Sequence, residues 1–155
     1  EQFFMRRVFD EQFFRKISDF CVDCASIKCY CRQDNEKGRE TPFWNATPDL
    51  LPVICRFVDF SFDCFTLQPN QLIDLIVMRF GMPYVEGLRD WNIELTAKIN
   101  DTHMRRLSNQ FDLNMSDDGE LEITRRGSDF KCTIEFSDLY CLCEWRPEIQ
   151  IYNDQ

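Results

Sequence analysis

The chain has 155 residues, a formal net charge of −9 at pH 7, and a composition that is 44% hydrophobic and 14% aromatic. This hydrophobic content suffices for one well-filled core and excludes a disordered tail. The excess of 27 acidic over 18 basic side chains argues against nucleic-acid and anionic-membrane binding, because phosphate groups attract positive charge. We therefore expect a partner that tolerates an acidic surface.

The ends of the chain and its longest apolar stretch bear on its organisation. Because the chain begins with Glu1 rather than Met, we expect an excised domain or a processed product. Residues 50–65 are the most apolar stretch, and it is interrupted by Pro52, Arg56, Asp59 and Asp63. A membrane-spanning helix needs roughly 18 uninterrupted apolar residues, so we expect no membrane span. We expect one domain over residues 1–155, cut from a larger chain.

The first predicted element is a helix over residues 9–31. Its apolar residues recur at spacings of three and four, which is typical of one buried helical face. They are Phe9, Phe13, Ile17, Phe20, Cys24, Ile27 and Cys31. A wholly polar loop over residues 34–41 follows, and it leads into Phe43 and Trp44, which we expect in irregular chain.

Three more helices are predicted from the same spacing. The second begins with Thr47 as N-cap and Pro48 at the first helical position, and it reaches residue 62. The third covers residues 72–80 and is closed by Gly81. The fourth covers residues 84–111.

The C-terminal part changes to a period of two, which is typical of strands with one buried face. The alternating apolar residues are Leu121 and Ile123; Phe130, Cys132, Ile134 and Phe136; Leu139, Cys141, Cys143 and Trp145; and Ile149 and Ile151. Turns at residues 126–129 and 137–138 join them as an antiparallel meander. The predicted fold class is therefore α+β, with about four helices followed by a C-terminal antiparallel meander of three to four strands.

The nine cysteines allow two interpretations: a secreted disulfide framework, or buried reduced thiols. The odd number leaves at least one thiol unpaired within the chain, and a chain with this apolar content does not need disulfides for stability. Both observations favour an intracellular protein. Three glycosylation sequons, at Asn45, Asn100 and Asn114, favour a secreted one. Pro48 weakens the first sequon, and the second lies in a predicted helix.

The spacing of Cys21, Cys24, Cys29 and Cys31 resembles a set of zinc ligands. On a continuous helix these side chains diverge, because each residue turns about 100°. We therefore interpret the cysteines as small core residues, and we assign Cys132, Cys141 and Cys143 to the core by the same parity. Two alternatives stay open: a zinc ion held by Cys29 and Cys31 with Cys141 and Cys143, and disulfides from the same region.

The sequence predicts no catalytic residue, no cofactor and no metal site. His103 is the single histidine, and its place between Ile99 and Leu107 predicts a core or half-buried side chain. The acidic residues around Gly119 do not match a calcium loop, and the five glycines form no phosphate-binding motif. Arg105 and Arg106, near Trp91, stay a minor candidate for an anion or acidic-peptide site.

These observations favour a non-enzymatic protein–protein interaction domain of an intracellular protein, cytoplasmic or nuclear, such as an adaptor or scaffold. Its partner is another protein or peptide, and the candidate partner-binding residues are Phe3, Phe4, Phe43 and Trp44, because aromatic residues dominate binding hot spots. The exposed edge of the meander is a second route, by strand addition. The alternatives are a secreted, disulfide-bonded and glycosylated ligand or receptor module, and an enzyme that pairs one cysteine with His103.

Overall fold

The computed structural model describes residues 26–29, 44–45, 48–55, 59–82, 90–128 and 130–147. The helical elements are η1 (Pro48–Leu50), α2 (Leu51–Ile54), α3 (Pro69–Phe80) and α4 (Asp101–Ser108). The strands are β1 (Ser26–Cys29), β2 (Trp44–Asn45), β3 (Asp59–Leu67), β4 (Asp90–Leu95), β5 (Phe111–Met115), β6 (Leu121–Arg125), β7 (Phe130–Ser137) and β8 (Tyr140–Pro147).

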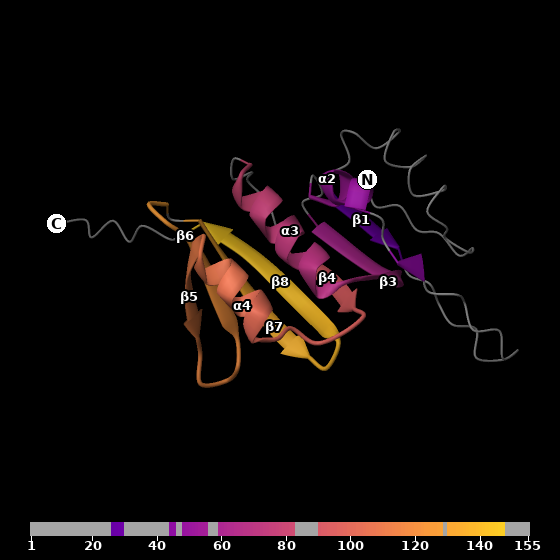
Figure 1. The fold of residues 1–155 in the computed structure, drawn as a ribbon. Coiled ribbons are helices and arrows are strands. Elements are labelled where there is room, and N and C mark those ends of the chain that lie inside the picture. Colours follow the sequence, from indigo (N-terminus) through magenta and orange to yellow (C-terminus); the bar gives the residue numbers. More distant parts are fainter. Residues whose placement is uncertain are drawn as a thin grey trace, which may run out of the picture.

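All eight described strands belong to one mixed sheet (Figure 1). The order is β1-β3-β4-β8-β7-β6-β5, and the short strand β2 also pairs with β3. Strands β1, β2 and β4 run parallel to β3. The remaining neighbouring pairs, β4–β8, β8–β7, β7–β6 and β6–β5, are antiparallel. Six strands, β3 to β8, form the main sheet, and β1 and β2 widen it at the β3 edge.

The three α-helices of the described part lie on the same face of the sheet (Figure 1). Helix α3 starts where Pro69 fixes the first turn and the amide of Gln68 donates to Oε1 of Gln71 at 2.8 Å. It ends at Gly81, as the sequence predicts. The predicted third helix is therefore confirmed.

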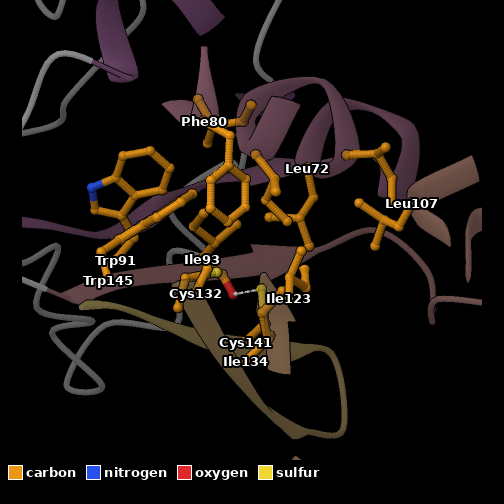
Figure 2. Packing of buried hydrophobic residues seen from close by; sticks show 14 of the residues in the cluster. Leu72, Phe80, Trp91, Ile93, Leu107, Ile123, Cys132, Ile134, Cys141 and Trp145 are labelled. Carbon is orange, nitrogen blue, oxygen red and sulfur yellow. Dashed lines mark hydrogen bonds between the residues drawn. The ribbon is translucent and has the colours of Figure 1, made fainter. Parts of the chain in front are cut away.

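The core lies between this helical layer and the sheet. Figure 2 shows Leu72 and Phe80 of α3 above Ile93, Cys132 and Ile134 of the strands. Trp91 and Trp145 close one end of the core, with ring centroids 4.9 Å apart in an edge-to-face arrangement. The aromatic residues of the described core therefore join helix to sheet rather than form a separate patch.

The predicted succession of about four helices and then a meander is wrong, because strands dominate the described residues. Residues 59–62 and 90–95, which we expected within helices, lie in β3 and β4, and residues 26–29 of the first predicted helix are β1. Trp91 and Leu95 are four residues apart, a spacing that suits a helical face and also a strand face. In β4 the polar residues Asp90, Asn92 and Glu94 alternate with buried apolar residues. This period of two is typical of a strand and not of a helix.

Of the predicted helix over residues 84–111, the structure describes residues 90–111, and this part contains one helix, the eight-residue α4. The second predicted helix shortens to η1 and the single turn α2. The meander is confirmed as β6, β7 and β8, and β5 extends it. The strand expected around Ile149 and Ile151, and most of the first predicted helix, lie outside the described residues. Within the described part, no helix is both long and apolar enough to cross a membrane.

Candidate interaction surface

The face of the sheet opposite the helices carries a set of polar side chains, which we call the open face. Strand alternation places them there, because their neighbours in sequence are turned toward the core. The open face consists of Asp112, Asn114, Glu122, Thr124, Lys131, Thr133, Glu144 and Arg146. None of these side chains is fully buried.

The strand register orders the open face into two rows. The first row crosses β5, β6, β7 and β8 as Asn114, Glu122, Thr133 and Glu144. The second row crosses the same strands two residues further along each strand, as Asp112, Thr124, Lys131 and Arg146. We call them the acidic row and the basic row, after their charged members on β6 to β8.

Ion pairs link the two rows. Nζ of Lys131 lies 3.0 Å from Oε2 of Glu122 on the neighbouring strand, and Arg146 pairs with Glu144 along β8. Both pairs are solvent-exposed in part, so each contributes at most about 1 kcal/mol to stability. Their main effect is to hold opposite charges in fixed places on the surface.

A groove of about 480 Å³ lies over these rows. It is lined by Asn114, Ser116, Glu120, Glu122, Lys131, Thr133, Glu144 and Arg146. Three carboxylates face two cations, so its net charge is −1. Glu122 and Glu144 are the paired acids, while Glu120 forms no ion pair with any described residue. The lining supplies both hydrogen-bond donors and hydrogen-bond acceptors to the groove.

The turn beside the groove is built by local hydrogen bonds. The amide of Ser116 donates to the carbonyl of Glu120 at 2.9 Å, and the amide of Glu120 donates to Oγ of Ser116 at 3.0 Å. Gly119 has a φ of 85°, a left-handed conformation that favours glycine. The acidic turn is therefore a solvated β5–β6 connection that positions Glu120 at the groove.

The described residues that line this groove include none of the candidate partner-binding residues from the sequence. Phe3, Phe4 and Phe43 lie outside the described residues. The backbone of Trp44 forms β2 and pairs with Phe65 of β3, so the prediction of irregular chain is wrong for Trp44. Its side chain is not described. The sequence signal for the open face is the polar half of the alternation in residues 121–146.

The cysteines of the meander are core residues, as predicted. Cys132, Cys141 and Cys143 are buried free thiols, and Sγ of Cys141 donates to the carbonyl of Ile93 at 3.5 Å (Figure 2). A side-chain hydrogen bond with Cys132, together with burial, raises the pKa of the Cys143 thiol. A hydrogen bond with Cys143, together with burial, raises the pKa of the Cys141 thiol. Cys141 and Cys143 are therefore poor nucleophiles at neutral pH, because the thiolate is the reactive form.

The alternative zinc site does not fit this topology. Cys29 lies on β1, and β3 and β4 separate that strand from Cys141 and Cys143 on β8. Three strand spacings amount to roughly 14 Å, too far for thiolates on both strands to share one zinc ion. The described residues hold no group of three or more residues able to bind a metal.

His103 is half-buried, which agrees with the prediction of a core or half-buried side chain. It lies on the first turn of α4, where its Nδ1 accepts a hydrogen bond from the amide of Asn100 at 3.1 Å. Oδ1 of Asn100 in turn accepts from the amides of Thr102 and His103. Asn100 and His103 therefore cap α4, which explains the histidine without catalysis.

The basic doublet at Arg105 and Arg106 does not form an anion site with Trp91. Trp91 is fully buried, and Arg106 pairs with Asp74 of α3. Arg126 is likewise occupied: its Nε lies 3.1 Å from Oδ1 of Asp112, and its Nη2 donates to the carbonyl of Ser108 at 2.9 Å. Arg106 therefore connects α4 to α3, and Arg126 connects the turn after β6 to α4 and β5.

Arg79 is the buried cation of the described core, with 1% of its surface exposed. Its Nη1 donates to the carbonyl of Cys55 at 3.3 Å and approaches Sδ of Met82 at 3.7 Å. Its Nε and Nη2 have no acceptor within the part of the chain that the structure describes. Burial lowers the pKa of Arg79, because the charged form loses its hydration.

The chain matches no family model, and comparisons with curated proteins and with solved structures found no match.

Proposed function

We propose that this chain is a non-enzymatic protein–protein interaction domain that binds an extended segment of a partner polypeptide in the groove of the open face. The observation that carries the proposal is the one-sided architecture of the described residues. Three helices cover one face of the sheet, and the opposite face carries a groove lined by eight polar residues. A folded scaffold that presents such a surface suits recognition.

The charge of the groove favours a basic segment. The carboxylate of Glu120, which pairs with no cation among the described residues, gives the lining its net charge of −1, and the whole chain carries −9. Lys or Arg side chains of a partner gain from this field, and an acidic segment is repelled. Peptide amides and carbonyls find matching groups in Asn114, Ser116 and Thr133.

We assign the protein to an intracellular setting, cytoplasmic or nuclear. Three described cysteines, Cys132, Cys141 and Cys143, are buried free thiols, which favours a reducing compartment. The secreted alternative draws on the exposed sequons at Asn100 and Asn114. A glycan on Asn114 would occupy the groove, so the two proposals exclude each other at that residue. Intact mass of the native protein with and without reductant separates them: glycan mass or disulfides would contradict the intracellular proposal.

The groove is tested by selecting peptides from a displayed random library on the wild-type chain and on the Thr133→Trp variant. Thr133 is half-exposed at the centre of the groove, so an indole there fills the groove without entering the core. A matched control, Thr102→Trp, adds the same indole on the exposed face of α4.

We expect enriched peptides with Lys or Arg that bind the wild type and the Thr102→Trp variant and lose at least tenfold in affinity on the Thr133→Trp variant. Peptides that bind all three chains equally would contradict the proposal. So would a library that yields no enrichment on the wild type.

A further inference from the structure

Strand β5 is the terminal strand of the sheet. It pairs with β6 on one side, and no described strand pairs with its other edge. Natural sheets blunt such edges with lysine, proline or a bulge, because free backbone groups are a template for another strand. The sequence of β5, Phe-Asp-Leu-Asn-Met, contains no lysine or proline, and its register with β6 is unbroken.

The hydrogen bonds of the β5–β6 turn fix which backbone groups face outward. The amide of Ser116 donates to the carbonyl of Glu120, so this opposed pair is hydrogen-bonded. In an antiparallel ladder hydrogen-bonded pairs alternate with open ones. The backbone N–H and C=O groups of Asp112 and Asn114 therefore point toward β6. Those of Phe111, Leu113 and Met115 point to the free edge.

The side chains at this edge are accessible. Met115 is one of the exposed large hydrophobic residues, with 53% of its surface exposed, and Leu113 is partly buried against the core. Asp112 and Asn114 are exposed on the open face. Nη2 of Arg126 reaches the carbonyl of Phe111 at 3.5 Å, a long contact at the start of the strand. The backbone groups of Leu113 and Met115 have no partner in the ladder among the described residues.

We propose that β5 pairs with β5 of a second copy of this chain, antiparallel and centred on Leu113, so that the two sheets become continuous. This register opposes the outward-facing backbones of Phe111 and Met115 and those of the two Leu113 residues, which allows about six hydrogen bonds. On the core side it places Phe111 opposite Met115 of the second copy. On the open face it places Asp112 opposite Asn114 of the second copy, a carboxylate beside an amide.

The neighbouring registers with the same parity are less favourable. A shift that opposes Phe111 to Leu113 brings the two Asp112 carboxylates directly opposite each other, and like charges in that position destabilise a sheet. The opposite shift leaves Phe111 without a partner. The sequence of β5 is therefore self-complementary in the centred register.

The same register aligns the charges of the two open faces. Asn114 ends the acidic row, and Asp112 ends the basic row. Because these two residues are opposed across the two-fold axis, Glu122 and Glu144 of one copy continue into the row of Lys131 and Arg146 of the other. This inference concerns the strand edge and stands apart from the proposed groove function.

A five-residue strand pair buries less surface than the 1,200–2,000 Å² that is typical of stable complexes, so the association is expected to be weak and concentration-dependent. The first test introduces Leu113→Cys. Hydrogen-bonded antiparallel pairs have Cα atoms about 5.5 Å apart, which suits a disulfide across the axis. Asp112→Cys is the matched control, because residue 112 faces residue 114 and not its own copy.

Under mild oxidation we expect covalent dimers of the Leu113→Cys chain well above those of wild type and of Asp112→Cys. Sedimentation of the reduced chain provides the second test. Asn114→Lys puts a cation opposite Asp112 twice per dimer and should tighten the association by roughly 2- to 30-fold, and Asn114→Asp should weaken it by a similar factor. Equal cross-linking of Leu113→Cys and Asp112→Cys, or association that ignores both Asn114 changes, would overturn the proposal.

Discussion

Phe80 and Trp145 pack edge to face, with ring centroids 5.1 Å apart and planes 67° apart. Phe80 is the last residue of α3, and Trp145 lies near the end of β8. The same Phe80 ring also contacts Phe111 of β5 at 4.7 Å and Phe130 of β7 at 5.1 Å. One side chain therefore fastens the central helix to three strands, including the two ends of the meander.

We expect Phe80→Ala to lower the free energy of unfolding by about 3–5 kcal/mol, because it leaves a large cavity and removes three ring contacts. Phe136→Ala is the control, since Phe136 is only partly buried at the margin of the core. Urea unfolding followed by tryptophan fluorescence measures both. A loss at Phe80 no larger than the loss at Phe136 would contradict this account of the core.

Replacing the N-cap of α4 tests the role given to Asn100. Asn100→Ala removes the acceptor of the Thr102 and His103 amides and should cost about 1 kcal/mol of stability. Asn100→Asp retains an acceptor and should cost much less. Thermal unfolding of the three proteins decides, and equal losses for both variants would show that the cap contributes nothing.

The buried thiols should make stability depend on alkaline pH. The pKa values of Cys141 and Cys143 are raised in the folded chain, so the folded state keeps protons that the unfolded state releases above its ordinary pKa of 9.0. Stability is therefore fully present below pH 9 and falls as the pH rises beyond it. Each thiol contributes a slope of about 1.4 kcal/mol per pH unit.

Urea unfolding under reducing conditions between pH 8 and pH 10.5 measures this slope. The Cys141→Ala and Cys143→Ala double variant loses both thiols and should be less stable at pH 8 but show a flatter decline. A decline of the same steepness in wild type and double variant would assign the effect to other groups.

Arg79→Met tests the cost of the buried guanidinium. Methionine has a similar length and needs no hydrogen bond, whereas Nε and Nη2 of Arg79 have no described acceptor. We expect the variant to be as stable as wild type or more stable by about 1–2 kcal/mol, as found when buried charges are replaced by apolar residues. Arg79→Ala, which also leaves a cavity, should be destabilised. A large loss in Arg79→Met would indicate that the charge is compensated.

The sequence predicted those elements whose pattern fits one period alone. Helix α3 has a broad apolar face and clear start and stop residues, and strands β6 to β8 alternate strictly. The error at β4 came from apolar residues four apart, which suit both periods. The alternation of Asp90, Asn92 and Glu94 with apolar residues is the signal that distinguishes the strand from a helix. At β3 the same alternation was present in Phe60 and Phe62 between Asp59, Ser61 and Asp63.

The candidate surface was harder to predict than the core. A strand's polar half looks the same whether it faces bulk solvent or lines a groove. Glu122 and Thr133 become neighbours only through strand pairing, and Glu144 joins them across a further strand. Such juxtapositions depend on register, which the sequence of one strand does not contain. The candidate aromatic residues were predicted from their type and from their position outside the predicted buried faces, and neither signal contains the strand register.

The most direct test of the central claim is an amide-resolved NMR titration of the ¹⁵N-labelled chain with a selected basic peptide. The account predicts shifts in residues of β6, β7 and β8 that line the groove, centred on Thr133, with the amides of α3 unchanged. The Thr133→Trp variant should show no such shifts at the same peptide concentration. Shifts centred on the helical face, or shifts that persist in the variant, would contradict the assignment of the open face as the interaction surface.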